Sequence, residues 1–487
     1  MKVLLINPPL RTNVPSTLYP IGICYVASFL KAHGHSVKIL DVNGYRWSKS
    51  EFIEKLKEQD FDAVGVGGLV TAFNHVSWIS DNVRRFFPRV PIFAGNTVAS
   101  TIPQILLKHT CVDIAVIGEG EETAVDLVNA LEEGRELASV KGIYYKSEDN
   151  IIKTPERPPI ADLDSLPYPA WDLVPMKIYI ENFKNCYGFV GTSLSTVRGC
   201  PYNCSFCCKG FIGYKVRSRS AESIIEEIEE LERRYRIEGF TFVDDLFTYD
   251  CRRTERFCDL MVEKKLNRLK WMCSSRANLF STDIAKKLKQ AGCISVGFGF
   301  ESHSQKVLDY YNKRCAVADQ KRVVDICRSV GIRFEASYIV GAANEDEQSL
   351  RETFLFCERN GISYLPNNLL MPQPQTKIYR EAIERGLIPD EYDYLKKIAD
   401  AGDTDVLVLN MTKFSDEKLV NLFQKYRMMS RSSNKRLKQY IADIRTTLFK
   451  LRRYGVKVCV DRLVNVISEK DIKNFNTARK QQRNTWE

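Results

Sequence analysis

The sequence predicts an α/β protein with an N-terminal doubly wound parallel sheet, a partial (β/α)6 barrel and a helical C-terminal region. Short β-branched runs alternate with helix-length stretches over residues 1–135 and again over residues 186–375. The chain has 487 residues, too many for one ordinary core, so several domains are expected. We expect residues 136–185 to be a linker and residues 376–487 to be a helical domain.

The first series of strands and helices has the pattern of a doubly wound sheet. Its candidate strands are VLLI at 3–6, SVKIL at 36–40, AVGVGG at 63–68, PIFAG at 91–95 and VDIAVIG at 112–118. Ligands of such sheets bind at the carboxyl ends of the strands. The ligand contacts that we expect at these ends are Pro8, Thr71, Asn96, Thr97 and Glu119. Glycines beside them let the backbone approach a large ligand, or they serve only the turns.

The linker has a composition of its own. GIYYKSEDNIIKTPERPP at 142–159 resembles a small hairpin, and DSLPYPAWDLVP at 164–175 is a proline-rich tether. We therefore expect this part of the chain to connect the two series rather than to form a core.

The second series predicts an open barrel. Its six candidate strands are LSTV at 194–197, FTFVDD at 240–245, KWMCSS at 270–275, ISVGFGF at 294–300, RFEASYIVG at 333–341 and SYLPNN at 363–368. Helical patterns such as SAESIIEEIEELERRYR separate them. Because six units fall two short of eight, the barrel should stay open, with its chemistry at the carboxyl ends of the strands.

Composition argues for a cytoplasmic protein. No apolar run reaches the roughly 18 to 20 residues of a membrane span, and Pro8 and Pro9 interrupt the N-terminus too early for a signal peptide. Fifteen cysteines in a reducing compartment indicate core thiols rather than disulfides. The formal charge of +10 is mild for this length, so we expect no nucleic-acid partner.

One loop of the second series concentrates cysteines. RGCPYNCSFCCKG at 198–210 places Cys200, Cys204 and Cys207 at C-x3-C-x2-C spacing after the first strand of the barrel. Iron-sulfur cubanes are held by thiolates, and three ligands leave one of four irons open for a substrate or cofactor. A zinc site is the alternative, but closed zinc sites usually pair two knuckles, and no second knuckle with histidines is present. The remaining interpretation is that these cysteines bind no metal.

This loop, with Phe206 directly before its third cysteine, resembles the signature of the radical S-adenosylmethionine superfamily. The resemblance covers about residues 190–375. It implies that the three cysteines bind a 4Fe-4S cluster, that S-adenosylmethionine chelates the open iron, and that the reduced cluster cleaves this cofactor to a 5′-deoxyadenosyl radical. Phe206 would pack beside the adenine. Cys208 has no role in the family and is expected to be a packing thiol.

The same resemblance suggests further contacts with S-adenosylmethionine. Asp244 and Asp245 end the second strand, where the family often carries acidic groups near the amine of the cofactor. Arg276 is placed to pair with its carboxylate, and Glu301 matches a motif at the end of the fourth strand. Ordinary salt bridges at the strand ends are the alternative for all four residues.

The N-terminal series resembles the cobalamin-binding domain that precedes the barrel in cobalamin-dependent radical enzymes. YPIGICYVASFLKAHGHSVKILDVN, AGNTVASTIP and VDIAVIGEGEET carry this resemblance over residues 1–135. The D-x-H-x-x-G motif that supplies an axial histidine in other cobalamin proteins is absent, which leaves the axial ligand open. His75, just past the third strand, is a candidate to approach the corrin. Some relatives have the domain and bind no corrin.

The C-terminal region predicts helices. Pro372, Pro374 and Thr376 resemble a segment that closes many of these barrels, so we expect a turn over the site. Residues 431–453 carry eight basic residues against one acidic, with apolar residues at helical spacing. Such a basic amphipathic helix either contacts a membrane surface peripherally, covers a bound substrate, or packs with a solvated face.

Together, the two resemblances imply a cobalamin-dependent methyltransferase acting on an unactivated carbon. An alkyl radical can take a methyl group directly from methylcobalamin, provided that both cofactors face one substrate. The alternatives are a radical cyclase or oxidase on the same scaffold, or a non-catalytic metal-binding or RNA-binding module. We expect a small-molecule or lipid-like substrate and an electron donor such as flavodoxin or ferredoxin.

Overall fold

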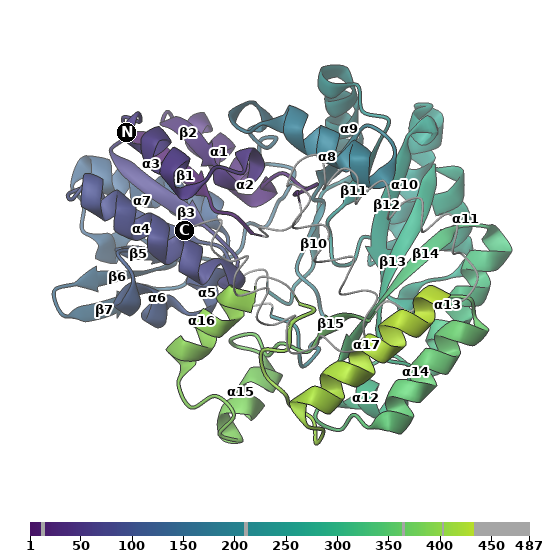
Figure 1. The fold of residues 1–487 in the computed structure, drawn as a ribbon. Helices are drawn as coiled ribbons and strands as arrows, with labels where there is room; N and C mark the ends of the chain where they lie inside the picture. Colours follow the sequence, from purple (N-terminus) through teal and green to yellow (C-terminus); the bar gives the residue numbers. More distant parts are fainter. Residues whose placement is uncertain (11–14, 209–212, 363–365, 402–403, 433–487) are drawn as a thin grey trace.

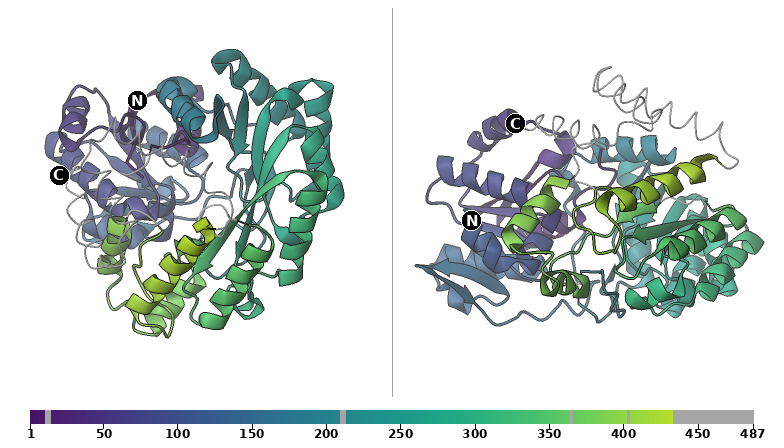
Figure 2. Two further views of the ribbon diagram at one scale, coloured as in Figure 1. Left: turned by 45° about the vertical axis from the view of Figure 1, so that its right-hand side comes forward. Right: turned by 60° about the horizontal axis from the view of Figure 1, so that its bottom comes forward.

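The protein consists of two lobes, each built around one sheet (Figure 1). The computed structural model describes residues 1–10, 15–208, 213–362, 366–401 and 404–432. Two further views show the same lobes side by side (Figure 2).

The first lobe contains a seven-stranded sheet of order β2-β1-β3-β4-β5-β6-β7. Its strands are β1 (Lys2–Asn7), β2 (Ser36–Asp41), β3 (Ala63–Gly67), β4 (Ile92–Gly95), β5 (Ile114–Val116), β6 (Ile143–Ser147) and β7 (Asn150–Lys153). The first five are parallel, which confirms the predicted doubly wound sheet. The expected hairpin is present, but it is part of this sheet rather than of a linker, because β6 pairs antiparallel with β5.

Helices cover both faces of this sheet. They are α1 (Ile21–Ala32), α2 (Val42–Tyr45), α3 (Lys49–Lys57), α4 (Phe73–Phe86), α5 (Thr97–Thr101), α6 (Pro103–His109) and α7 (Gly120–Glu133). Alternate residues of β1 point to opposite faces, so that Leu5 joins the core under α1 and α7 while Leu4 joins the core under α4 and α6. The central strands β1, β3, β4 and β5 are buried on both faces, as is typical of a parallel sheet.

The strand order places a topological switch point between β1 and β3. In an order of 2-1-3-4-5, connections from these neighbouring strands run to opposite faces and leave a crevice at their carboxyl ends. The residues there are Pro8 and the segment 67–71. This edge faces the second lobe (Figure 1).

The second lobe contains an open sheet of six parallel strands, in the order β15-β14-β13-β12-β11-β8. These are β8 (Gly191–Leu194), β11 (Gly239–Phe242), β12 (Lys270–Ser275), β13 (Cys293–Glu301), β14 (Arg333–Val340) and β15 (Pro366–Leu369). The six-stranded open barrel is confirmed. Its first strand begins earlier than predicted, and part of the predicted run forms β9 (Val197–Arg198), which pairs with β10 (Arg217–Ser218).

The outer face of this sheet is covered by amphipathic helices. They are α9 (Ala221–Tyr235), α10 (Cys251–Glu263), α11 (Thr282–Gln290), α12 (Gln305–Tyr310), α13 (Val317–Val330) and α14 (Glu347–Arg359). Trp271 of β12 is fully buried and packs edge-on against Phe247 and Phe257. Such aromatic pairs stabilise the core beyond the area that they bury.

The linker helix α8 (Met176–Tyr187) joins the two lobes. It packs along β8 and α2, and the hydroxyl of Tyr179 donates to Asp41 Oδ2 at 2.8 Å. Upstream of α8, the indole of Trp171 donates to the hydroxyl of Tyr19 at 3.1 Å. Both contacts are buried, so the linker is part of the core rather than a loose tether.

The C-terminal helices divide between the lobes. Thr376 is the N-cap of α15 (Lys377–Glu384), and its hydroxyl accepts a hydrogen bond from the amide of Tyr379. α16 (Glu391–Ala401) packs on α4 of the first lobe, and its Tyr392 stacks on His109 of α6. α17 (Asp416–Ser432) packs near β15 of the second lobe (Figures 1 and 2). C-terminal residues such as Ile378 and Ile398 also share a small hydrophobic core with Val307 and Tyr311 of the second lobe.

The predicted basic helix at 431–453 lies outside the described residues except for its first two positions. Among the helices that the structure describes, none is both long and apolar enough to cross a bilayer.

Candidate functional site

The cysteine loop rises from a narrow two-stranded stem. β9 and β10 pair antiparallel, so the cysteine loop begins after Arg198 and ends before Arg217, which lies opposite Arg198. Gly199 follows with φ of +91°, and a Cβ there would lie 2.2 Å from the carbonyl oxygen of Lys215. Only glycine fits this crossing, because a side chain would be both strained and in collision with backbone.

The far part of the loop is tied to the barrel. The amide of Ser205 donates to the carbonyl of Tyr311 at 2.8 Å, and its hydroxyl donates to the carbonyl of Tyr310 at 3.0 Å. The amide of Ile378 donates in turn to the carbonyl of Ser205. Cys204 is buried, while Cys200 and Cys207 are half-buried. The loop therefore holds its thiols on a backbone with fixed partners.

Arg276 lies against the buried cysteine. Its Nη1 is 3.7 Å from Cys204 Sγ, and its guanidinium stacks 3.7 Å above the ring centre of Tyr202. The side chain is 5% exposed, and within the described residues its Nη2 has no hydrogen-bond partner. A buried cationic donor without an acceptor favours an anionic ligand at this point.

Glu301 forms a buried ion pair at the end of β13. Its Oε1 is 2.7 Å from Lys313 Nζ, and both side chains are almost inaccessible. A β-bulge between Gly299 and Glu301 and a φ of +61° at Glu301 turn its side chain into this place. A Cβ on Gly299 would lie 2.4 Å from the carboxylate, so glycine is needed to make room for the pair.

Phe206 packs beside this ion pair. Its ring meets Tyr311 edge to face at 5.1 Å, and Lys313 Nζ lies 5.8 Å from its centre. The buried hydroxyl of Tyr311 has no partner in the described part of the chain, and burial raises its pKa well above the usual value. Burial also raises the pKa of nearby Glu345 to about 7, although the amide of Gly341 donates to that carboxylate. Arg276, through Cys204, and the Glu301–Lys313 pair, through Phe206, thus both lie beside the cysteine loop.

The two predicted aspartates have different environments. Asp244 is buried and accepts from the amides of Thr196 and Val197 at 2.6 and 3.0 Å, and also from the Thr196 hydroxyl. Burial raises its pKa in spite of these bonds. Since the chain itself uses most of the acceptor capacity of this carboxylate, Asp244 braces the start of the cysteine loop. Asp245 is exposed. Their predicted contacts with the amine of S-adenosylmethionine stay predictions.

The predicted ligand edge of the first sheet is built around the switch point. A Cβ on Gly68 would lie 3.5 Å from the ring of buried Pro8, so these two segments touch. Thr97 Oγ1 accepts from the amide of Val70, next to Thr71. Asn96 is exposed with φ of +68°. Pro8, Thr71, Asn96 and Thr97 therefore lie at one edge, and their contact with a ligand stays a prediction.

Glu119 lies at the same edge but has protein partners. Arg217 donates to both of its carboxylate oxygens at 2.6 and 2.9 Å, and Arg198 lies 3.4 Å away. Burial alone would raise the pKa of Glu119, but these arginines outweigh it and hold the pKa below the usual value. The ion pairs cross from the first lobe to the second, and the predicted ligand contact of Glu119 stays a prediction.

His75 lies in the first turn of α4. Burial lowers its pKa to about 4, with a smaller effect from the charge of Lys49. The imidazole is therefore neutral at pH 7, which is the form that ligates metals. Its role as an axial ligand stays a hypothesis.

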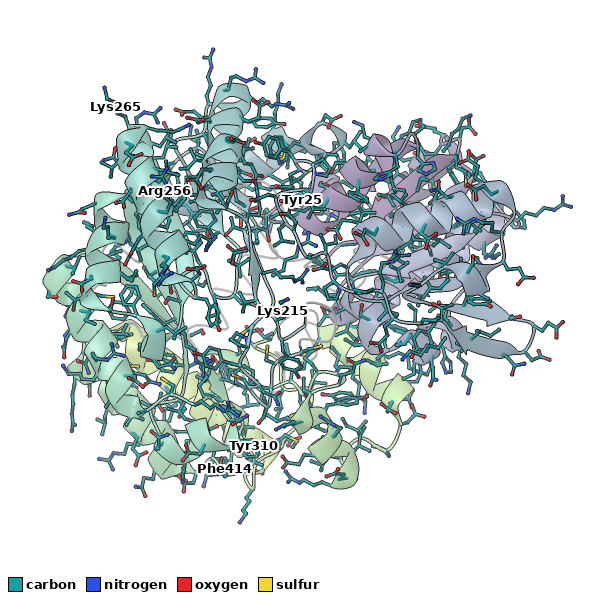
Figure 3. The ribbon with its side chains drawn as sticks, turned by 180° about the vertical axis from the view of Figure 1, so that it is seen from behind. Tyr25, Lys215, Arg256, Lys265, Tyr310 and Phe414 are labelled. Atoms are coloured by element: carbon teal, nitrogen blue, oxygen red, sulfur yellow. The ribbon has the colours of Figure 1, made fainter. Side chains whose placement is uncertain are left out.

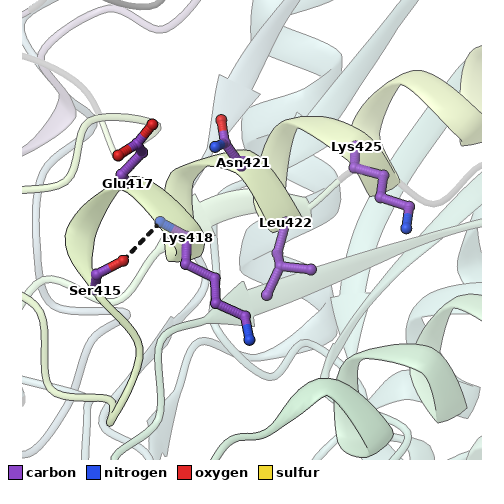
Figure 4. Close-up of a pocket in the computed structure, with 6 residues that line it drawn as sticks. All are labelled: Ser415, Glu417, Lys418, Asn421, Leu422 and Lys425. Atoms are coloured by element: carbon purple, nitrogen blue, oxygen red, sulfur yellow. Dashed lines mark hydrogen bonds between the residues drawn. The ribbon is translucent and has the colours of Figure 1, made fainter.

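The described residues contain no cluster for a single metal ion and no deep hollow with reactive groups outside this site. No three His, Cys, Asp or Glu side chains converge on a position for a single metal ion within the described ranges. A cubane differs from such a site, because each thiolate holds a different iron. The hollow on α17 in Figure 4 is lined by surface residues such as Ser415, Lys418 and Lys425, and carries no chemistry.

Several residues of the site were missed by sequence reasoning. Tyr202, Lys313 and Tyr311 have no motif of their own, since each is placed by the fold. Glu345 had a signal, because an acidic residue follows a strand-end glycine in GAANE at 341–345. Arg198 and Arg217 flank the cysteine loop in the sequence, but nothing there indicates their partners.

Comparisons with known proteins match both parts of the chain. A family model described as B12 binding domain matches residues 8–128, and one described as Radical SAM superfamily matches residues 194–357. An uncharacterized methyltransferase of Pyrococcus horikoshii is 31% identical over 394 residues, which cover 80% of this chain and 84% of that protein.

Two further matches are named as different kinds of enzyme, one as a cyclase and one as a methyltransferase. The anaerobic magnesium-protoporphyrin IX monomethyl ester cyclase of Rubrivivax gelatinosus is 29% identical over 73% of this chain and 65% of its own. The radical S-adenosylmethionine methyltransferase TsrM of Kitasatospora setae, solved with cobalamin and a 4Fe-4S cluster bound, superposes with a TM-score of 0.67 at 20% identity, covering 79% of this chain and 75% of its own. At that identity the superposition shows the common fold alone.

Proposed function

This chain belongs to the radical S-adenosylmethionine enzymes that carry a B12 binding domain, and we propose that it methylates an unactivated carbon of a small-molecule or lipid-like substrate. The observation that carries the proposal is the pairing of the two sites. The cysteine loop and the switch-point edge of the first sheet both lie at carboxyl ends of strands, and buried ion pairs join the two edges. One substrate between them would contact both.

The donor set of the second lobe fits a 4Fe-4S cluster. Cys200, Cys204 and Cys207 would hold it, since thiolates are its usual ligands and three of them leave one iron open. The unpartnered Nη2 of Arg276 beside Cys204 supplies positive charge for the cluster or for a carboxylate at the open iron. The Glu301–Lys313 pair and Phe206 would form the wall of the S-adenosylmethionine site.

The edge of the first sheet fits a large flat ligand such as cobalamin. A Cβ on Gly95 would meet nothing within 4 Å, and one on Gly67 would meet only a methyl group at 3.9 Å, so bare backbone lines the edge. Exposed Leu10 and Leu69 add apolar surface beside it. Pro8, Thr71, Asn96 and Thr97 would contact the cobalamin.

When bound, the cluster supplies the electron that splits S-adenosylmethionine, and cobalamin carries the methyl group. The residues of the chain then bind and orient these groups and exclude water. The electron would come from a donor such as flavodoxin or ferredoxin in the cytoplasm.

Methyl-labelled S-adenosylmethionine tests the proposal. We expect anaerobically reconstituted protein with reduced cobalamin to release S-adenosylhomocysteine and to place the label on the bound cobalamin. With its substrate, the enzyme should also form 5′-deoxyadenosine and a labelled product. These products are measured by mass spectrometry, and protein without cobalamin is the control. Failure to release S-adenosylhomocysteine while deoxyadenosine forms would contradict methyl transfer.

A radical cyclase or oxidase is the second candidate, supported by the similarity to the Rubrivivax cyclase. It predicts a product with a new ring or double bond and no label. The same experiment therefore separates the two functions, and formation of deoxyadenosine under either would exclude a non-catalytic protein.

A further inference from the structure

Two arginines occupy paired positions at the base of the cysteine loop. Arg198 of β9 lies directly opposite Arg217 of β10, and Cys200 follows Arg198 by two residues. Because both strands are only two residues long, their own ladder holds the stem weakly. Together with the bond from the Val197 amide to Asp244, the contacts of the two arginines therefore set the position of the stem.

Both arginines bind the first lobe. Arg198 Nη2 donates to Glu121 Oε1 at 2.6 Å, and Arg217 holds Glu119 with two parallel hydrogen bonds. Glu119 occupies the N-cap position of α7, and Glu121 lies in its first turn. We call these four residues, Glu119, Glu121, Arg198 and Arg217, the interdomain clamp.

The clamp is buried. Its side chains are between 5% and 16% exposed, in contrast to the mostly exposed ion pairs on the outer helices. The guanidinium of Arg198 also lies 5.5 Å from the ring centre of Tyr25 on α1, and Arg217 donates to the carbonyl of Ile160 at 2.5 Å. Figure 3 labels Tyr25 and Lys215, which both lie where the two lobes meet. Bidentate, desolvated pairs fix orientation as well as distance.

The stem and the middle of the loop thus have different partners. The stem is held by α7 of the first lobe through its arginines and by Asp244 of the second lobe through Val197, whereas Ser205 farther along the loop is held by the second lobe. Glu119 itself lies three residues after the end of β5 and so is on the carboxyl edge where we place cobalamin. A shift between the lobes would therefore change the position of the cysteine loop relative to the cobalamin edge.

We propose that Arg198 and Arg217 are positioning residues, which through the interdomain clamp set the cysteine loop against the cobalamin edge for methyl transfer. This inference rests on the proposed function. The clamp orients the two lobes, whereas the cysteines themselves hold the cluster, so we expect methyl transfer to depend on the clamp more strongly than S-adenosylmethionine cleavage does.

The test compares two products of the full-length enzyme carrying cluster and reduced cobalamin. In Glu121→Gln and Arg198→Lys, both close in size to the native residues, we expect S-adenosylhomocysteine formation to fall by ~10²-fold relative to deoxyadenosine formation, the loss typical of a misplaced reacting group. A merely structural role would lower both products together, in proportion to folded enzyme. Unchanged product ratios in both variants would overturn the proposal.

The matched control is Lys31→Gln. Lys31 and Asp172 also form an ion pair of 2.9 Å between α1 and the linker, but their side chains are 43% and 57% exposed. We expect wild-type ratios, since exposed pairs contribute little. A ratio change as large as that of Glu121→Gln would show a general effect of lost charges and would overturn the clamp.

Amide hydrogen exchange separates this proposal from the proposed function. If the wild-type enzyme released no S-adenosylhomocysteine, methyl transfer would fail, but exchange of residues 197–200 can be measured without turnover. Faster exchange there in Glu121→Gln, and not in Lys31→Gln, supports the clamp. Equal exchange in both variants and the wild type overturns it.

Discussion

Replacing Cys200, Cys204 and Cys207 together by alanine is expected to abolish both cluster assembly and deoxyadenosine formation. The wild-type protein, reconstituted anaerobically, should hold about four irons and four sulfides at this site. Cys204→Ala alone should have almost the full effect, because this cysteine is the buried one and lies against Arg276. Iron and sulfide analysis, the visible absorption of the cluster and deoxyadenosine release are the measurements.

Cys208→Ala is the matched control for these substitutions. It directly follows the third predicted ligand and is half-buried like Cys200 and Cys207. We expect it to keep cluster and cleavage. A triple variant that still cleaves S-adenosylmethionine would refute the cysteine assignment, and loss of the cluster in Cys208→Ala would show that the ligand set is different.

Replacing Asp244 by alanine is expected to cause a large loss of stability. The substitution removes the acceptor of the buried amides of Thr196 and Val197, and it removes the negative charge near buried Arg253. Breaking a buried charge network by removing one partner typically costs about 3–5 kcal/mol. Because Thr196 and Val197 lead into the cysteine loop, cluster content should fall as well. Urea unfolding and iron analysis are the measurements.

Asp245→Ala provides the neighbouring control. Asp245 is exposed, and substitutions at such positions usually change stability by less than about 0.5 kcal/mol. Asp244→Asn should lie between the two, since it keeps one acceptor oxygen. If Asp244→Ala unfolded at the same urea concentration as Asp245→Ala, the bracing role of Asp244 would be wrong. If either alanine variant kept its stability but lost S-adenosylmethionine binding, the result would instead support the contact predicted from the sequence.

Local patterns predicted much of the fold. The alternation of apolar runs and amphipathic stretches identified all five parallel strands of the first sheet and the six units of the barrel. The errors lie where the pairing of distant strands, rather than the local sequence, determines the structure. The run at 194–197 is split between β8 and β9 because the chain leaves the sheet at Ser195, and the hairpin at 143–153 was predicted as linker because nothing in its own residues indicates that β5 lies beside it.

The candidate site was predicted unevenly for the same reason. The cysteines share one short loop, so spacing alone indicates them. Arg276 and Glu301 were predicted at strand ends, and the structure places Arg276 beside Cys204 and pairs Glu301 with Lys313. Glu119 was predicted as a ligand contact, whereas its partner Arg217 lies 98 positions away. Strand-end position predicts an edge, but it does not predict which side chains meet there.

By itself, the sequence determined the two α/β series, the cysteine loop and the family to which the chain belongs, because these depend on periodicity and on residues close together along the chain. Only the tertiary structure decided that the hairpin extends the first sheet, that α16 packs on the first lobe, and that Asp244 braces the loop. It also decided the interdomain clamp. These features come from burial and charge pairing between distant segments, which exist only after the chain has folded.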